Sequence, residues 1–170
     1  KNIFKSIKVD EKENNFVVVS PDAGSLKRTL KFAKGFGLDT IIMHKQRNYS
    51  KKNTVDKSII IGNTELDNKT AIICDDMVDT GGTLIKCIDR LIENGIKDAI
   101  VVITHGIFSG QAIDRLNNCS HIKKVVVSNS IYQDKNILIC PKIEIINIDD
   151  CLSTIIERLS NNKSLSELFT

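Results

Sequence analysis

Two adjacent carboxylates followed by a turn of small residues form the most informative stretch of the sequence. Asp75 and Asp76 come after an apolar run over residues 71–74, and residues 79–83 read Asp-Thr-Gly-Gly-Thr. Glycines let a backbone approach a ligand closely, and the N–H groups at the start of a helix bind phosphate. Because Asp75 and Asp76 would repel a phosphate, they suit ribose hydroxyls, or a metal that those hydroxyls coordinate. The stretch therefore predicts a site for a phosphorylated sugar.

Other interpretations of this turn fit less well. A Walker loop needs Gly-x-x-x-x-Gly-Lys followed by Ser or Thr, and the sequence contains none. Residues 79–81 match the Asp-Thr-Gly tripeptide of aspartic proteases, but the tripeptide occurs once and leads into a helical pattern. A capped helix after a buried strand would explain neither the second acid nor the Gly-Gly pair.

Four further segments carry polar groups that could serve a site, and each also has an ordinary structural interpretation. Residues 20–24 (Ser-Pro-Asp-Ala-Gly) follow an apolar run and could be a capped turn. Residues 44–47 (His-Lys-Gln-Arg) open a basic stretch that could be a solvated loop. Residues 104–110 include Ser109, a good helix N-cap. Residues 162–169 could be a frayed terminus.

The elements that must position these residues alternate between short apolar runs and amphipathic stretches. Continuous apolar strands alternating with helices predict an α/β fold, a parallel sheet with helices on both faces, in which ligands bind at the carboxyl ends of the strands. We expect strands over residues 16–19, 40–43, 58–61, 71–74, 99–103, 125–127 and 143–146. We expect helices over residues 25–36, 80–94 and 149–159 and from Ser109, with Gly95 left-handed after the second of them.

The overall composition narrows the class of protein. A chain of 170 residues that is 41% hydrophobic and 26% charged is typical of one soluble globular domain. The net charge of +3 is too small to predict nucleic-acid binding but suits phosphorylated metabolites. No apolar run reaches the length of a membrane span and no signal peptide opens the chain, so we expect no membrane partner. An odd number of cysteines without Cys-x-x-Cys predicts free thiols and a cytoplasmic protein.

Together these motifs resemble those of the ribose-phosphate diphosphokinases, the phosphoribosyl diphosphate synthetases. The acid pair and its turn alone are equally similar to type I phosphoribosyltransferases, but residues 20–24, 44–47, 104–110 and 162–169 resemble the diphosphokinases, in the same order. The resemblance implies a type I phosphoribosyltransferase-like fold. It also implies that the chain corresponds to the C-terminal half of such an enzyme. Residues 1–15 would be a linker from a missing N-terminal domain, residues 16–160 the domain and residues 161–170 a tail.

The resemblance further implies a reaction and a role for each motif. The family transfers the diphosphoryl group of MgATP to the anomeric hydroxyl of D-ribose 5-phosphate, giving 5-phosphoribosyl 1-diphosphate and AMP. The implied partners are thus ATP and ribose 5-phosphate, the cofactor is Mg²⁺, and the assembly is a homo-oligomer, a hexamer in the family. The implied roles are ribose-5-phosphate binding for Asp75, Asp76, Asp79, Thr80, Gly81, Gly82 and Thr83, catalysis for Lys45 and Arg47, Mg²⁺ binding for Asp22, and an allosteric site for Ser164, Ser166 and Phe169.

Three features depart from the family pattern. Gln46 replaces a usual acidic residue, residues 48–54 form a somewhat longer loop, and Tyr132 replaces a usual proline. Two alternatives stay open: a type I phosphoribosyltransferase, and a non-catalytic regulatory paralogue of the diphosphokinases. Release of AMP from ATP and ribose 5-phosphate would separate the three.

Overall fold

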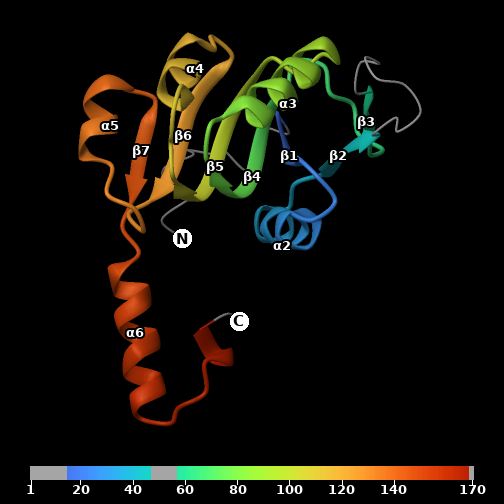
Figure 1. Ribbon diagram of the computed structural model, residues 1–170. Helices are drawn as coiled ribbons and strands as arrows, with labels where there is room; N and C mark the ends of the chain where they lie inside the picture. Colours follow the sequence, from blue (N-terminus) through green and yellow to red (C-terminus); the bar gives the residue numbers. More distant parts are fainter. Residues whose placement is uncertain (1–14, 47–56, 169–170) are drawn as a thin grey trace.

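The described residues form seven strands and six helical segments (Figure 1). The computed structural model describes residues 15–46 and 57–168, without the side chains of residues 45, 46, 57 and 58. The strands are β1 (Phe16–Ser20), β2 (Thr40–Gln46), β3 (Lys57–Ile61), β4 (Thr70–Val78), β5 (Asp98–Gly106), β6 (Ile122–Ser128) and β7 (Ile143–Ile146). The helices are α2 (Leu26–Phe36), α3 (Gly82–Glu93), α4 (Ala112–Asn118), α5 (Asp134–Ile139), α6 (Asp149–Ser160) and the 3-10 turn η1 (Ser166–Leu168).

The strands form one sheet in the order β3-β2-β1-β4-β5-β6-β7. Neighbouring strands are parallel except β2 and β3, which pair antiparallel with Met43 opposite Ile60. The predicted parallel sheet is therefore confirmed for six strands, and an antiparallel edge strand completes it. The basic stretch predicted as a loop is partly strand, because β2 continues to Gln46 and β3 begins at Lys57.

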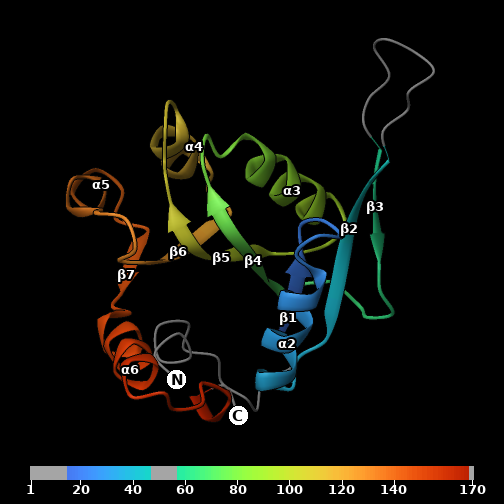
Figure 2. The same ribbon diagram turned by 60° about the horizontal axis from the view of Figure 1, so that its bottom comes forward.

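Helices cover both faces of the sheet, as predicted. Figure 2 shows α3 and α4 on one side and α2 on the other. These three helices bury side chains against the sheet: α3, for example, buries Leu84, Cys87, Ile88 and Leu91, at the spacing of an amphipathic helix. The apolar strand residues accordingly divide into two clusters, one including Ile73 and the other Ile72 and Cys74. Apolar packing on both faces therefore stabilises the sheet whose strand ends carry the polar residues.

The last helix stands apart from these layers. Figure 1 shows α6 leading away from the sheet after β7, with η1 beyond its far end. No residue of α6 is buried, and Leu152, Ile156 and Leu159 are exposed. No helix within residues 15–46 and 57–168 combines the length and the apolar character needed to cross a bilayer.

Several predicted boundaries were wrong, each for a physical reason. β4 continues through Asp75 and Asp76 to Val78, because the ladder with β5 goes on past the apolar core and pairs Met77 with His105. The helix expected from Thr80 begins at Gly82, since Gly81 is left-handed at its N-cap. The predicted left-handed Gly95 is confirmed, with φ of 96°.

Two features near the end of the sheet also differ from expectation. Ser109 does not cap a helix, because α4 begins at Ala112. The short helix α5 was not predicted, because it spans 6 residues and buries none of them, so it has no apolar stripe. The five cysteines are free, as predicted; three are buried, Cys119 is partly exposed and Cys151 is exposed.

Candidate active site

The strand order identifies the place where a ligand would bind. The chain passes from β1 outward to β2, whereas from β4 it passes in the opposite direction to β5, so β1 and β4 are neighbours at a topological switch point. In open α/β sheets ligands bind in the crevice outside the carboxyl ends of such strands. Asp22 follows β1, and Asp75 and Asp76 lie near the end of β4. The fold thus gathers three predicted site residues at one edge of the sheet.

The acid pair is held by the backbone of its own strand end. The Asp75 Oδ1 atom accepts the N–H of Asp76 at 2.9 Å, and the Asp76 Oδ1 atom accepts the N–H of Met77 at 2.9 Å. Burial raises the pKa of Asp75 to about 6, and the charges of Asp76 and Asp22 add to this rise. Burial also opposes ionisation of Asp76, but its hydrogen bond with Asp75 and the charge of Arg28 outweigh it and lower the pKa of Asp76. The two carboxylates therefore differ in how readily they ionise.

This difference predicts a pH-dependent stability. Because the pKa of Asp75 is raised from 3.8 to about 6 on folding, the stability that its proton contributes is complete below the lower value and is lost as the pH rises through the higher one. Asp75→Asn carries no charge, so it should melt at a higher temperature than the parent protein near about pH 8. This advantage should shrink near about pH 4.5, as measured by thermal unfolding at both values.

The matched control for this measurement is Asp89→Asn, which changes an exposed carboxylate on α3. It should show no comparable pH-dependent gain. An Asp75→Asn protein that melts below the parent near about pH 8 would contradict the assignment of a raised pKa to Asp75.

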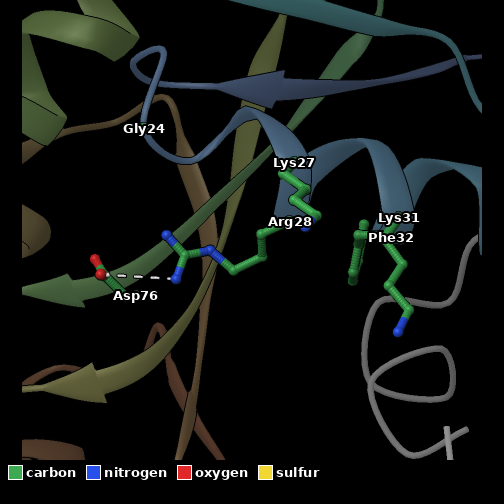
Figure 3. A pocket seen from close by; sticks show the side chains of 6 residues that line it. All are labelled: Gly24, Lys27, Arg28, Lys31, Phe32 and Asp76. Atoms are coloured by element: carbon green, nitrogen blue, oxygen red, sulfur yellow. Dashed lines mark ion pairs between the residues drawn. The ribbon is translucent and has the colours of Figure 1, made fainter.

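Arg28 is a residue of this site that the sequence analysis did not find. It lies in the first turn of α2, with Nη2 3.8 Å from Asp75 Oδ1 and Nη1 3.6 Å from Asp76 Oδ2. Figure 3 shows its side chain reaching from α2 to Asp76. It borders an open cavity of about 720 Å³ that is lined by Gly24, Lys27, Arg28, Lys31, Phe32 and Asp76. No local sequence pattern indicates a role for Arg28, because residues 28 and 75 are far apart in the sequence and come together only through the order of the strands in the sheet.

The small-residue turn after β4 leads directly into the start of α3. Gly81, at the N-cap of α3, has φ of 74°, a conformation that favours glycine. A helix N-terminus favours an anion, and the first turn of α3 contains no acidic residue to repel one. Thr80 and Thr83 are exposed. The turn therefore offers free hydroxyls and a helix start to a ligand.

Two residues from elsewhere hold this turn in place. The Ser109 hydroxyl donates a hydrogen bond to the Asp79 carboxylate. Arg115 of α4 donates from Nη1 to the carbonyl oxygen of Thr80 at 2.6 Å. The sequence analysis interpreted Ser109 as a helix cap and did not single out Arg115. Local patterns could not reveal either contact, because the bonded residues are 30 and 35 positions apart in the sequence.

Asp22 could take part in holding a magnesium ion. Mg²⁺ usually keeps several waters and takes one or two carboxylates together with substrate phosphates. Asp22 is exposed, and its Oδ1 atom accepts the N–H of Ser25 at 2.8 Å, which leaves the second oxygen of the carboxylate for a ligand. No cluster of three or more His, Cys, Asp or Glu side chains suited to a metal occurs within the described ranges. The donor set fits a Mg²⁺ shared with substrate phosphates.

The other predicted residues lie elsewhere or outside the described part. Lys45 is in β2, with its backbone opposite Ser58, and Arg47 falls outside the described residues, as does Phe169. Ser164 and Ser166 share a hydrogen bond of 2.7 Å between their hydroxyls in the tail beyond α6. Figure 1 shows the end of α6 and η1 away from the sheet that carries the ends of β1 and β4.

The ends of β5 and β6 carry a polar network beside the acid pair, since Thr104 and Ser128 line a cavity of about 250 Å³ together with Arg28 and Asp75. His105 Nδ1 lies 2.8 Å from the Ser130 hydroxyl, and Ser128 donates to the carbonyl oxygen of Thr104 at 2.7 Å. His105 is exposed. Tyr132, which departs from the family pattern, is 74% exposed, so its ring takes no part in the core.

Comparisons with known proteins agree with this geometry. The family described as "Phosphoribosyl synthetase-associated domain" matches residues 59–170. Ribose-phosphate pyrophosphokinase 3 of Saccharomyces cerevisiae is 37% identical over 168 residues, which are 99% of this chain and 51% of the yeast protein. The chain thus spans about half the length of the curated relative it matches.

Solved structures extend the comparison to the fold. The crystal structure of phosphoribosylpyrophosphate synthetase from Mycobacterium smegmatis matches with a TM-score of 0.79 and 30% identity, over 95% of this chain and 50% of that chain. Adenine phosphoribosyl transferase from Trypanosoma brucei matches with a TM-score of 0.53 and 14% identity, over 79% of this chain and 64% of that chain, and shows the fold alone. The predicted type I phosphoribosyltransferase-like fold is confirmed, and the chain belongs to the phosphoribosyl synthetase family, that of the ribose-phosphate pyrophosphokinases.

Proposed function

We propose that the protein carrying this chain transfers the diphosphoryl group of MgATP to the anomeric hydroxyl of D-ribose 5-phosphate, giving 5-phosphoribosyl 1-diphosphate and AMP. In this proposal the chain supplies the half that binds ribose 5-phosphate. The observation that supports it most is the acid pair and the small-residue turn on one strand end at the switch point of the sheet. The family to which the chain belongs supports the choice of reaction.

Each part of the site would bind one part of the sugar phosphate. The start of α3 and the hydroxyls of Thr80 and Thr83 would hold the 5-phosphate. Asp75 and Asp76 would accept hydrogen bonds from the ribose hydroxyls, because an ionised carboxylate is an acceptor only. Since the acids and the turn all lie within residues 75–83, one ligand could contact both and be held in a single orientation. The anomeric hydroxyl would then be the part left for the transferred group.

The phosphate-transfer side of the site would use cations. Lys45 and Arg47 would stabilise the charge that develops on the transferred group, since Lys offers a compact charge and Arg a planar fork. Asp22 would contribute one oxygen to a Mg²⁺ that neutralises the phosphates when it is bound. We also propose that the protein is a homo-oligomer, to which the exposed apolar side chains of α6 would contribute surface.

The ribose assignment predicts the effect of neutralising the acid pair. The double variant Asp75→Asn with Asp76→Asn should weaken ribose-5-phosphate binding by roughly a hundredfold, because each hydrogen bond to a charged group contributes about 1.5–3 kcal/mol. Calorimetric titration measures the affinity, and thermal unfolding should show that the variant is folded. Asp89→Asn, on α3, is the control that should bind normally. Unchanged affinity in the double variant would leave these acids with a structural role only.

Formation of AMP tests the reaction itself. Incubation of the complete natural protein with ATP, Mg²⁺ and ribose 5-phosphate should release AMP and 5-phosphoribosyl 1-diphosphate. A protein that binds ribose 5-phosphate and releases no AMP would be a non-catalytic relative. A protein that instead consumes 5-phosphoribosyl 1-diphosphate with a base would be a phosphoribosyltransferase.

A further inference from the structure

Asp75 and Asp76 present a problem that their own strand does not solve. Successive side chains of a strand point to opposite faces of the sheet, and the preceding residues Ile73 and Cys74 indeed belong to different core clusters. Two neighbouring carboxylates also repel each other, and the charge of Asp22 adds to this repulsion at Asp75. To face one sugar together, the two acids need a group that draws both toward the same side.

Arg28 is placed to be that group. A single guanidinium contacts both acids, with Nη2 3.8 Å from Asp75 Oδ1 and Nη1 3.6 Å from Asp76 Oδ2. The Arg28 side chain is 46% exposed, whereas those of Asp75 and Asp76 are 30% and 49% exposed, so the contacts lie at the border of the crevice. Figure 3 shows the side chain spanning the gap between α2 and the end of β4.

The lengths of these contacts matter for what the acids can still do. At 3.6 and 3.8 Å they are ion pairs, longer than the 2.7–3.2 Å of ordinary N–H···O hydrogen bonds. Arg28 therefore balances charge without engaging the carboxylate oxygens as a donor. The Oδ1 atoms of Asp75 and Asp76 each accept a backbone N–H, and the lone pairs not used in this way remain for sugar hydroxyls.

We propose that Arg28 is a positioning residue of the ribose site, whose guanidinium balances the charge of Asp75 and Asp76 and turns both carboxylates toward the sugar hydroxyls. This inference rests on the proposed function, because it assumes that the acids bind ribose. In this proposal α2 makes no direct contact with the sugar but takes part in substrate binding through Arg28.

The matched control is the neighbouring residue on the same helix. Lys27 lines the same cavity and carries the same charge, but it forms no ion pair with the acids among the described residues. Ribose 5-phosphate is titrated calorimetrically into the complete natural protein in the absence of nucleotide. Arg28→Met should weaken binding by about tenfold, which corresponds to about 1.4 kcal/mol, because the two carboxylates lose the cation that balances their charge. Arg28→Lys should restore most of the affinity, and Lys27→Met should bind like the parent.

A double-mutant cycle tests whether Arg28 acts through the acids. If it does, Arg28→Met should have little further effect in an Asp76→Asn background, because residues in one ion-pair network are not additive. A loss that is the same in both backgrounds would overturn the inference, as would normal ribose-5-phosphate binding by Arg28→Met. Raised KM for ATP with unchanged ribose-5-phosphate affinity would also overturn it and make Arg28 a phosphate ligand. Failure of the parent protein itself to bind ribose 5-phosphate would instead overturn the proposed function.

Discussion

Replacing Lys45 or Arg47 by alanine in the full-length protein should lower kcat by roughly a hundredfold or more, with little change in ribose-5-phosphate affinity. The expected loss corresponds to about 3 kcal/mol of transition-state stabilisation, the amount typical of one preorganised charge or donor. The acids and the phosphate turn that would bind the sugar lie on β4 and α3, whereas Lys45 lies on β2. Binding and transfer should therefore respond to different substitutions.

The chemistry gives this separation its physical reason. Phosphoryl-type transfer requires positioning and neutralisation of charge on the non-bridging oxygens more than covalent catalysis. A cation that acts only on the transferred group stabilises the transition state more than the bound sugar phosphate, so its loss lowers kcat and leaves ribose-5-phosphate affinity largely intact. The measurement is the steady-state rate of AMP release at saturating substrates, with calorimetry for ribose 5-phosphate.

Lys51→Ala provides a matched control, because Lys51 is a cation of the same basic stretch that the family resemblance assigns no role. It should keep nearly the parent turnover. Near-normal turnover in both Lys45→Ala and Arg47→Ala would show that the assignment of these two residues is wrong. An equal loss in Lys51→Ala would indicate a general effect of positive charge in place of a specific catalytic pair.

The sequence predicted what is local, and the structure added what depends on topology. The acid pair, the small-residue turn and the left-handed Gly95 were predicted from residue types at short spacing. The acids lie near the end of β4, the turn leads into α3, and the left-handed Gly95 is confirmed. Arg28 and Arg115 could not be predicted in this way. Their contacts with Asp76 and Thr80 depend on which helix packs beside which strand end.

The error at β4 shows a second limit of local patterns. The apolar run ends at Cys74, so the sequence predicts the end of the strand there, but the ladder with β5 continues to Val78 opposite Gly106. Backbone pairing follows the partner strand and not the side chains. The consequence for function is favourable: the ladder holds Asp75 opposite Ile103, so the acids project from regular, rigid strand instead of a loop.

The 170-residue chain alone should bind ribose 5-phosphate weakly but form no measurable AMP from ATP and ribose 5-phosphate. The proposed sugar-phosphate site consists of residues on β4 and α3 with Arg28 of α2, all within this chain. The yeast relative is about twice as long, since the chain corresponds to 51% of its length. We infer that most adenine contacts come from the part of such a relative that this chain does not cover, and the sequence has no Walker loop that could replace them.

We expect the chain alone to lose all activity, because transfer depends on how ATP is aligned with the sugar as well as on binding. Lys45 and Arg47 can stabilise the transferred group only if ATP is held in line with the anomeric hydroxyl, and a misplacement of about 1 Å can cost on the order of a hundredfold. The purified chain is assayed for AMP with Mg²⁺, ATP and ribose 5-phosphate, with calorimetry to show that the sugar site is intact. Adding the N-terminal half of a family member in trans should restore turnover. Steady, magnesium-dependent AMP release by the chain alone would refute this division of labour, because ATP would then be bound by residues of these 170.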